Sequence, residues 1–417
     1  MSLVLITVVG GLFLLFATIQ GRLHGSVLTA PLLFSVAGLA LYYSGLPGHE
    51  FELSWLHLVA EVTLVLVLFA DAARIDLKAL RSYHNLSMRM LLAGMPLVML
   101  TGVLFAYWCF PELSWWELGL IAAILAPTDA ALGQAVILDE SIPGRIRQTL
   151  NVESGLNDGM ALPAVLLFAT LASEGAHTER SWTEFVALQL VLGPLVGILV
   201  GWVGAKAISW AVAKGSLVES SEGITVIALA LLAYAGAESV HGNGFISAFV
   251  AGAVFRHFLQ HHCEFLFGFM ETEGEFLMLA TFLGVGMILI PQYLPLIDGS
   301  VILYALLSLT VFRMLPISIS LLGTGLLPPT HMFLGWFGPR GLASVVFSLL
   351  VLDEFDIAGI ERIMAVIVTT VSLSIILHGL TAAPLARAYG KMVASMPECE
   401  EKNEVPPQPL RSGHASS

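Results

Sequence analysis

The residues of this chain best suited to chemistry lie in the run 151–163, where polar side chains interrupt an otherwise apolar segment. Glu153 and Asn157 are four residues apart, and so are Ser154 and Asp158. Residues at this spacing lie one above the other on a helix, so the four side chains form two adjoining polar stripes. Carboxyl, amide and hydroxyl groups supply the oxygen ligands that a hard monovalent cation prefers.

A second polar run, Ala-Pro-Thr-Asp-Ala at 126–130, lies in the middle of the preceding apolar segment. Pro127 cannot donate a backbone hydrogen bond and its ring clashes with the preceding turn, so we expect the helix to break there. A break would free the carbonyl of Thr128 as a cation ligand, and Asp129 would cap the new helix N-terminus. An ordinary proline kink with a buried capping acid explains the same residues equally well.

A third interruption lies at 336–344, where Gly338, Pro339 and Gly341 surround Arg340. Two interrupted helices in separate halves of a chain indicate half-helices that cross around a site. We expect Arg340 to offset the negative C-terminal ends of the half-helices and to form a structural ion pair with Glu153. The two halves share no clear residue-level repeat, so inverted symmetry is inferred from the paired interruptions alone.

These three runs lie in segments that lipid must solvate, because 57% of the 417 residues are hydrophobic and only 12% are charged. Apolar stretches of about 20 residues, long enough to span a bilayer as helices, recur from residue 3 to residue 386. The pattern predicts an all-α integral membrane protein with about thirteen transmembrane helices, because a barrel needs short alternating strands. The expected spans begin near residues 3, 26, 54, 86, 115, 148, 184, 222, 243, 275, 299, 330 and 358.

The basic residues predict how the chain is oriented in the membrane. Of the 18 Lys and Arg residues, 14 fall in breaks on one side and two on the other, while Arg313 and Arg340 lie within spans. Since cytoplasmic loops collect Lys and Arg, the N-terminus is expected outside and the C-terminus inside. The remaining segment, 387–417, holds Pro406, Pro407 and Pro409 among acidic and small residues and is predicted to be a disordered cytoplasmic tail.

Composition also excludes several classes of function. A net charge of −13 argues against a nucleic-acid partner, which would require clustered basic residues. The three cysteines are far apart and show no metal-binding spacing, and no nucleophile–base arrangement is visible. We therefore expect neither an enzyme nor a cofactor.

Because an intramembrane charge costs about 2.5 to 3.5 kcal/mol, Asp158 should hold either a proton or a cation. A buried polar network that only joins helices is the alternative.

Together these segments resemble the NhaP-type bacterial sodium/proton antiporters of the monovalent cation/proton antiporter superfamily. The resemblance is most specific at 153–158, and Thr128-Asp129 and the Gly-x-Arg-Gly run at 338–341 also match. It implies inverted repeats with two broken crossing helices, a homodimer and an inner-membrane location. It further implies that a core bundle, from the spans near 86–172 and 299–386, moves against a dimerisation bundle formed by the other spans.

The resemblance also implies a set of residues for the ion site. These are Asp158, Ser154 and Thr128 as ligands, Asn157 and Asp129 beside them, and Asp71 at the end of the third span. Relatives usually carry Glu at the position of Asp71. Because the central pair is Asn-Asp, the resemblance favours electroneutral exchange of one Na⁺, or Li⁺ or K⁺, for one proton.

Two other transport classes remain open at this point. A sodium-coupled symporter for an organic solute could use a related broken-helix fold, and would require a roomy solute cavity. A channel would conduct without a counter-ion, although a buried carboxylate beside paired helix breaks fits alternating access better.

Overall fold

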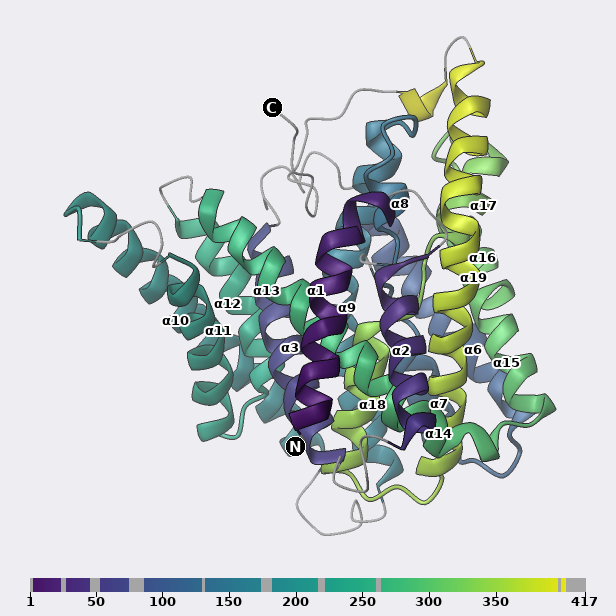
Figure 1. Ribbon diagram of the computed structural model, residues 1–417, viewed down its shortest axis with the longest axis horizontal. Coiled ribbons are helices and arrows are strands. Elements are labelled where there is room, and N and C mark those ends of the chain that lie inside the picture. The colour runs from purple at the N-terminus through teal and green to yellow at the C-terminus, as the bar shows by residue number, and fades with distance from the viewer. Residues whose placement is uncertain are drawn as a thin grey trace.

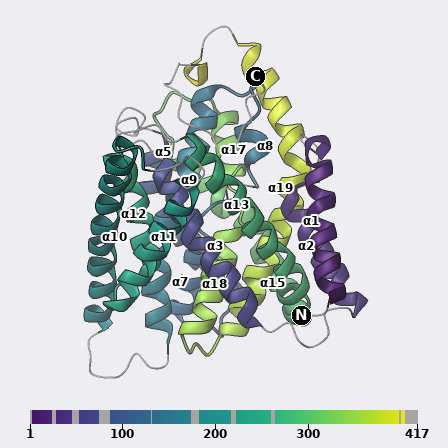
Figure 2. The same cartoon turned by 60° about the vertical axis from the view of Figure 1, so that its left-hand side comes forward.

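The computed structural model describes residues 3–23, 28–45, 53–74, 86–129, 132–173, 182–216, 222–259, 264–396 and 399–402. All the regular elements in these ranges are helices, which confirms the predicted all-α class (Figure 1). Most of the helices run roughly parallel or antiparallel along one direction, as the turned view in Figure 2 also shows.

A helical segment lies at each of the thirteen predicted positions within the described residues. The long helices are α1 (Leu3–Leu23), α3 (Leu53–Arg74), α9 (Gly144–Ala172), α10 (Trp182–Ala213), α13 (Glu264–Gly284) and α19 (Ile360–Ala394). The others of at least nine residues are α2 (Ala30–Ser44), α6 (Met95–Cys109), α7 (Trp115–Ile124), α11 (Glu222–Ser239), α12 (Gly244–Phe258), α15 (Gly299–Leu309), α16 (Val311–Ser320), α17 (Pro328–Trp336) and α18 (Leu342–Glu354). The short helices are α5 (Leu86–Arg89), α8 (Gln134–Ile137) and α14 (Ile290–Tyr293).

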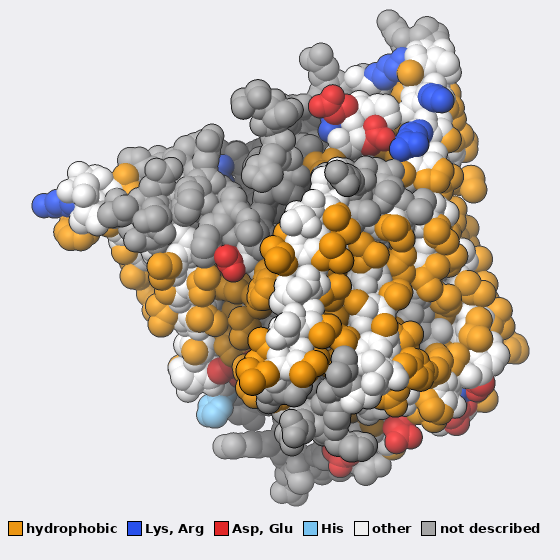
Figure 3. Space-filling model, viewed as in Figure 1, with side chains coloured by type: hydrophobic (Ala, Val, Ile, Leu, Met, Phe, Trp, Pro, Cys, Tyr) orange, Lys and Arg blue, Asp and Glu red, His pale blue; other side chains and the backbone are white. Residues whose placement is uncertain are grey.

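Eight of the described helical spans are long and apolar enough to cross a membrane. Figure 3 shows the matching surface, with apolar side chains covering the middle and most of the visible Lys and Arg near the upper end. Exposed apolar surface on this scale is unsuited to water and suits lipid. Thirteen membrane crossings remain a prediction, because several described helices are shorter than a full span.

Two of the predicted spans are interrupted, as expected. Helix α7 begins with a capping box, in which Ser114 and Glu117 each bond the other's backbone, and it ends three residues before Pro127. Helix α8 begins only at Gln134. The second interruption separates α17 from α18, and the intervening residues 337–341 are not helical.

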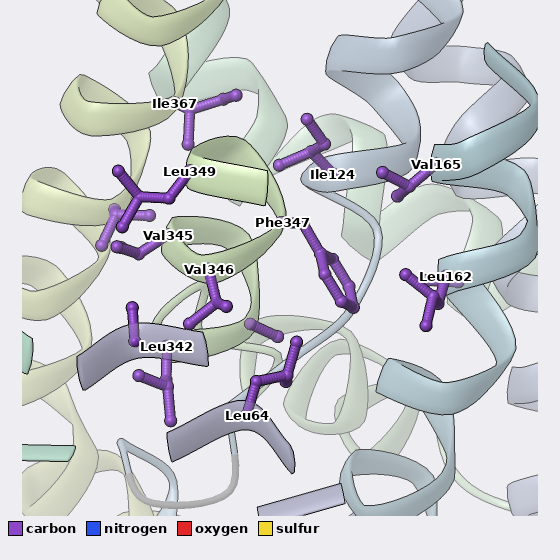
Figure 4. Packing of buried hydrophobic residues seen from close by; sticks show 14 of the residues in the cluster. Leu64, Ile124, Leu162, Val165, Leu342, Val345, Val346, Phe347, Leu349 and Ile367 are labelled. Atoms are coloured by element: carbon purple, nitrogen blue, oxygen red, sulfur yellow. The ribbon is translucent and has the colours of Figure 1, made fainter. Parts of the chain in front are cut away.

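The second half of this broken span, α18, is packed deep in the molecule. Its buried apolar side chains belong to one cluster with residues of α3, α7, α9 and α19. Figure 4 shows this packing around α18, with Phe347 directed toward α9, where Leu162 and Val165 lie. Because interiors are close-packed, α18 and the break before it are held by neighbours on several sides.

The prediction of a disordered tail from residue 387 is wrong for the part that the structure describes. Helix α19 continues to Ala394, and Glu400–Lys402 form a 3₁₀ turn in which Glu401 is fully buried. Hydrogen bonds from Leu327 and Thr330 to the Glu401 carboxylate hold this turn. Residues 397–398 and 403–417 lie outside the described residues.

Candidate functional site

The two interrupted spans contact each other directly at their breaks. The backbone N–H of Asp129 donates to the carbonyl of Pro339 at 2.8 Å. The Ser344 hydroxyl, in the first turn of α18, donates to the carbonyl of Ile124 at the end of α7, also at 2.8 Å. These bonds join segments more than 200 residues apart, and they confirm that the broken helices cross.

Arg340 lies at this crossing and is completely buried. Its guanidinium NH1 donates to the carbonyl of Ala126 and, at 3.0 Å, to that of Pro127. These carbonyls follow the end of α7, where unpaired backbone oxygens give the helix a negative end. The expectation that Arg340 offsets a half-helix C-terminus is therefore confirmed.

Asp129, in the first break, contacts the start of α18 in the same way that Arg340, in the second break, contacts the end of α7. Its carboxylate accepts a hydrogen bond of 2.8 Å from the backbone N–H of Leu342, the first residue of α18. We predicted a cap on the second half of its own span, whereas the observed cap lies on the other broken helix. The contact requires glycine at 341, because a Cβ there would overlap the Asp129 carboxylate.

The predicted ion pair between Glu153 and Arg340 is wrong. Glu153 pairs with Arg313 of α16, whose NH2 group lies 2.8 Å from both carboxyl oxygens. The two side chains are only 2% and 1% exposed. Arg340 has its own acceptors at 126 and 127, and Arg313 fits here because Gly338 has no Cβ, which would overlap the guanidinium.

Three of the predicted ion-site residues form a buried hydrogen-bonded group. The Thr128 and Ser154 hydroxyl oxygens are 3.1 Å apart, and the Asn157 amide donates to the Thr128 hydroxyl at 2.6 Å. The side-chain oxygen of Asn157 has no hydrogen-bond partner within the described part of the chain. Asp158 follows on α9 and is buried at 9% exposure. Oxygen ligands for a cation are therefore gathered next to a buried carboxyl group.

The remaining predicted ligand, Asp71, is also buried, in the last turn of α3. Helix α3 packs against both α9 and α18. The role of Asp71 in binding an ion remains a prediction, as do the ligand roles of the other site residues.

Two further residues at the crossing, Ser374 and His378 of α19, were not identified from the sequence as site residues. The Ser374 hydroxyl accepts from the backbone N–H of Arg340 at 2.7 Å, and His378 Nε2 lies 2.9 Å from the carbonyl of Trp336. Their signal in the sequence is a pair of polar residues four apart in an apolar span, the same spacing as in α9.

Comparison with known proteins identifies the family. The family model described as the sodium/hydrogen exchanger transmembrane domain matches residues 4–388. The chain belongs to this family. It is a multi-pass membrane protein with the fold of a cation/proton antiporter, and its curated relatives are transporters.

The curated proteins similar to this chain include a potassium antiporter and a probable sodium antiporter. A K⁺/H⁺ antiporter, NhaP2 of Shewanella oneidensis, is 26% identical over 391 residues, which is 92% of this chain and 65% of that protein. A probable Na⁺/H⁺ antiporter of Schizosaccharomyces pombe is 27% identical over 72% of this chain and 41% of its own length. This exchanger-family chain therefore spans less than two thirds of the length of these two relatives.

A solved structure matches over nearly all of its length. The sodium proton antiporter MjNhaP1 from Methanocaldococcus jannaschii superimposes with a TM-score of 0.70 and 18% sequence identity. The match covers 92% of this chain and 98% of that chain. At this identity the likeness establishes the fold alone.

Proposed function

We propose that this member of the exchanger family is a secondary antiporter that exchanges a monovalent cation for a proton. The observation that carries the proposal is the buried group of Thr128, Ser154 and Asn157 next to Asp158, at the crossing of two broken helices. Hydroxyl, amide and carboxylate oxygens suit a small hard cation, and a buried carboxyl group is neutralised by either a cation or a proton. Competition for Asp158 would then couple the two fluxes.

The charges at the crossing support this assignment of Asp158. Glu153 is neutralised by Arg313, and Asp129 caps α18, so both acids have structural partners. Asp158 is the acid of this region that we assign to transport. With one such carboxyl group beside an amide, exchange of one cation for one proton moves no net charge.

We infer Na⁺ as the first candidate cation, with K⁺ and Li⁺ as alternatives that the same oxygen ligands could serve. The relatives named above as a potassium antiporter and a probable sodium antiporter support testing both Na⁺ and K⁺. We also propose a homodimer in the inner membrane, with the N-terminus outside and the Lys- and Arg-rich end cytoplasmic. The core bundle would move against the scaffold to give alternating access.

Proton flux in proteoliposomes tests the proposal. Purified protein is reconstituted with an imposed pH gradient, and sodium, potassium or lithium is added outside, with a potassium/valinomycin voltage clamp for the sodium and lithium runs. We expect cation-dependent collapse of the gradient that the clamp does not change. Asp158→Asn should abolish the flux, whereas Asp356→Asn, a matched change at an exposed position, should retain it.

The runner-up is a sodium-coupled symporter for an organic solute. No gradient collapse with any of the three cations over a broad pH range would favour this alternative. Exchange retained by folded Asp158→Asn protein would overturn the assignment of Asp158.

A further inference from the structure

Two side chains of α19 contact both ends of the non-helical segment 337–341. At one end His378 Nε2 lies 2.9 Å from the carbonyl of Trp336, the last residue of α17. At the other end the backbone N–H of Arg340 donates to the Ser374 hydroxyl at 2.7 Å. Both side chains are buried, with 1% and 0% exposure. In the membrane interior such backbone groups have no water to bond, so α19 supplies the partners.

The two side chains also contact each other. His378 Nδ1 lies 3.2 Å from the Ser374 hydroxyl and 3.0 Å from the Ser374 carbonyl. Since the carbonyl of Trp336 can only accept, Nε2 donates to it, and in a neutral ring the Ser374 hydroxyl can then donate to Nδ1. The contacts form one connected chain from Arg340 through Ser374 and His378 to Trp336, which we call the α19 clasp.

The α19 clasp leads to the proposed ion site in few steps. The Arg340 guanidinium contacts the carbonyls of Ala126 and Pro127, directly before Thr128. The Thr128 hydroxyl in turn bonds Asn157 and lies 3.1 Å from that of Ser154. A displacement of Arg340 would therefore move the backbone that carries Thr128.

We infer that Ser374 and His378 are positioning residues for cation binding: the α19 clasp holds the backbone of Arg340, and through it Thr128, at the position that the ion site requires. Neither residue touches the ion. The inference rests on the proposed cation/proton exchange, and it adds that cation affinity depends on a contact made from outside the site.

The test separates positioning from a general role in folding. His378→Ala, Ser374→Ala and His378→Gln are reconstituted at equal amounts of folded protein, and proton flux is measured against cation concentration. We expect the KM for the cation to rise about fivefold in each alanine variant, as loss of one or two buried hydrogen bonds would produce. His378→Gln keeps a side-chain donor for the Trp336 carbonyl and should stay within about twofold of wild type.

Thr381→Val is the matched control. Thr381 lies on the same helix and accepts a hydrogen bond of 3.1 Å from the Trp336 indole, so its loss removes a contact with the side chain of Trp336 but none with the backbone of Trp336 or Arg340. Its KM should equal that of the wild type.

A lower yield or Vmax with unchanged KM in Ser374→Ala and in His378→Ala would overturn the inference, and so would a His378→Gln variant as weak as His378→Ala. If His378→Ala does not reconstitute, Ser374→Ala, which removes a single oxygen atom, decides by the same criterion. Failure of the proposed exchange is distinguishable, because wild type and Thr381→Val would then show no cation-dependent flux.

Discussion

Two of the carboxylates that cap helix N-termini among the described residues, Asp129 and Glu401, lie in different surroundings. At the crossing, Asp129 accepts from the N–H of Leu342 at the start of α18. At the end of the molecule where α19 terminates, Glu401 accepts from the N–H of Leu327, directly before α17, and from the Thr330 hydroxyl, both at 2.8 Å. One cap comes from within a broken span, and the other comes from the chain beyond the last long helix.

Each of the two places also has an ion pair, and the two ion pairs differ in how deeply they are buried. Arg313 and Glu153 at the crossing are 1% and 2% exposed, whereas Arg145 and Glu400 beside the Glu401 cap are 20% and 49% exposed at a distance of 3.0 Å. When a buried charge loses its partner, no water can take the partner's place. Water can take that place beside an exposed charge. The same pairing should therefore stabilise the protein by very different amounts at the two places.

The largest effect is expected from breaking the buried pair. Arg313→Gln leaves the Glu153 carboxylate without its partner and should destabilise the protein by about 3 to 5 kcal/mol. Thermal unfolding of the purified protein in detergent measures this loss. The double variant Glu153→Gln/Arg313→Gln removes both charges and should recover part of it; no recovery would show that the pairing itself is not the cause.

Removing the Asp129 cap at the crossing should cause the second-largest loss of stability. Asp129→Ala removes the acceptor for Leu342 and should cost about 1 to 2 kcal/mol, because the charge also favours the positive end of α18. Asp129→Asn keeps an acceptor oxygen and should cost less in the same unfolding assay. Equal losses in the two variants would show that the charge, and not the hydrogen bond, makes the cap.

The Glu401 cap should contribute about 1 kcal/mol and should depend on pH. Burial by itself raises the pKa of Glu401, but the hydrogen bonds from Leu327 and Thr330 outweigh it and hold the pKa below its ordinary value. A depressed folded-state pKa means that the stabilisation is fully present above the ordinary value of about 4.3 and is lost as the pH falls through the lower one.

Thermal unfolding of the wild type and of Glu401→Gln at a series of pH values measures this pH dependence. The difference in stability should be constant from neutral pH down to about 5 and should shrink in more acidic buffer. A difference that instead grew toward acidic pH would contradict the direction of the shift.

The exposed pair should have the smallest effect. Arg145→Ala is expected to cost at most about 1 kcal/mol, because solvent and side-chain entropy offset the attraction between exposed charges. The difference from wild type should shrink in about 1 M salt, where the Debye length falls to about 3 Å. A loss as large as that of Arg313→Gln would mean that burial does not explain the contrast between the two places.

The sequence alone determined the features that depend on a residue's own backbone or its near neighbours. Pro127 and the Gly338-Pro339 pair predicted both helix breaks, because proline and glycine act on the helix that contains them. The four-residue spacing of Glu153 with Asn157 predicted a polar face on one helix. The apolar runs predicted a membrane protein made of helices, since lipid leaves few ways to satisfy the backbone.

Only the tertiary structure decided which partners meet. Glu153 had two arginines available within spans, and Arg313, 160 residues away, took the place that we predicted for Arg340. Asp129 caps a helix more than 200 residues away, and Glu401 belongs to a segment whose composition predicted disorder. These pairings depend on how distant helices pack and on where a glycine, which has no Cβ, leaves room for a side chain. The spacing of residues along the chain predicts neither of these.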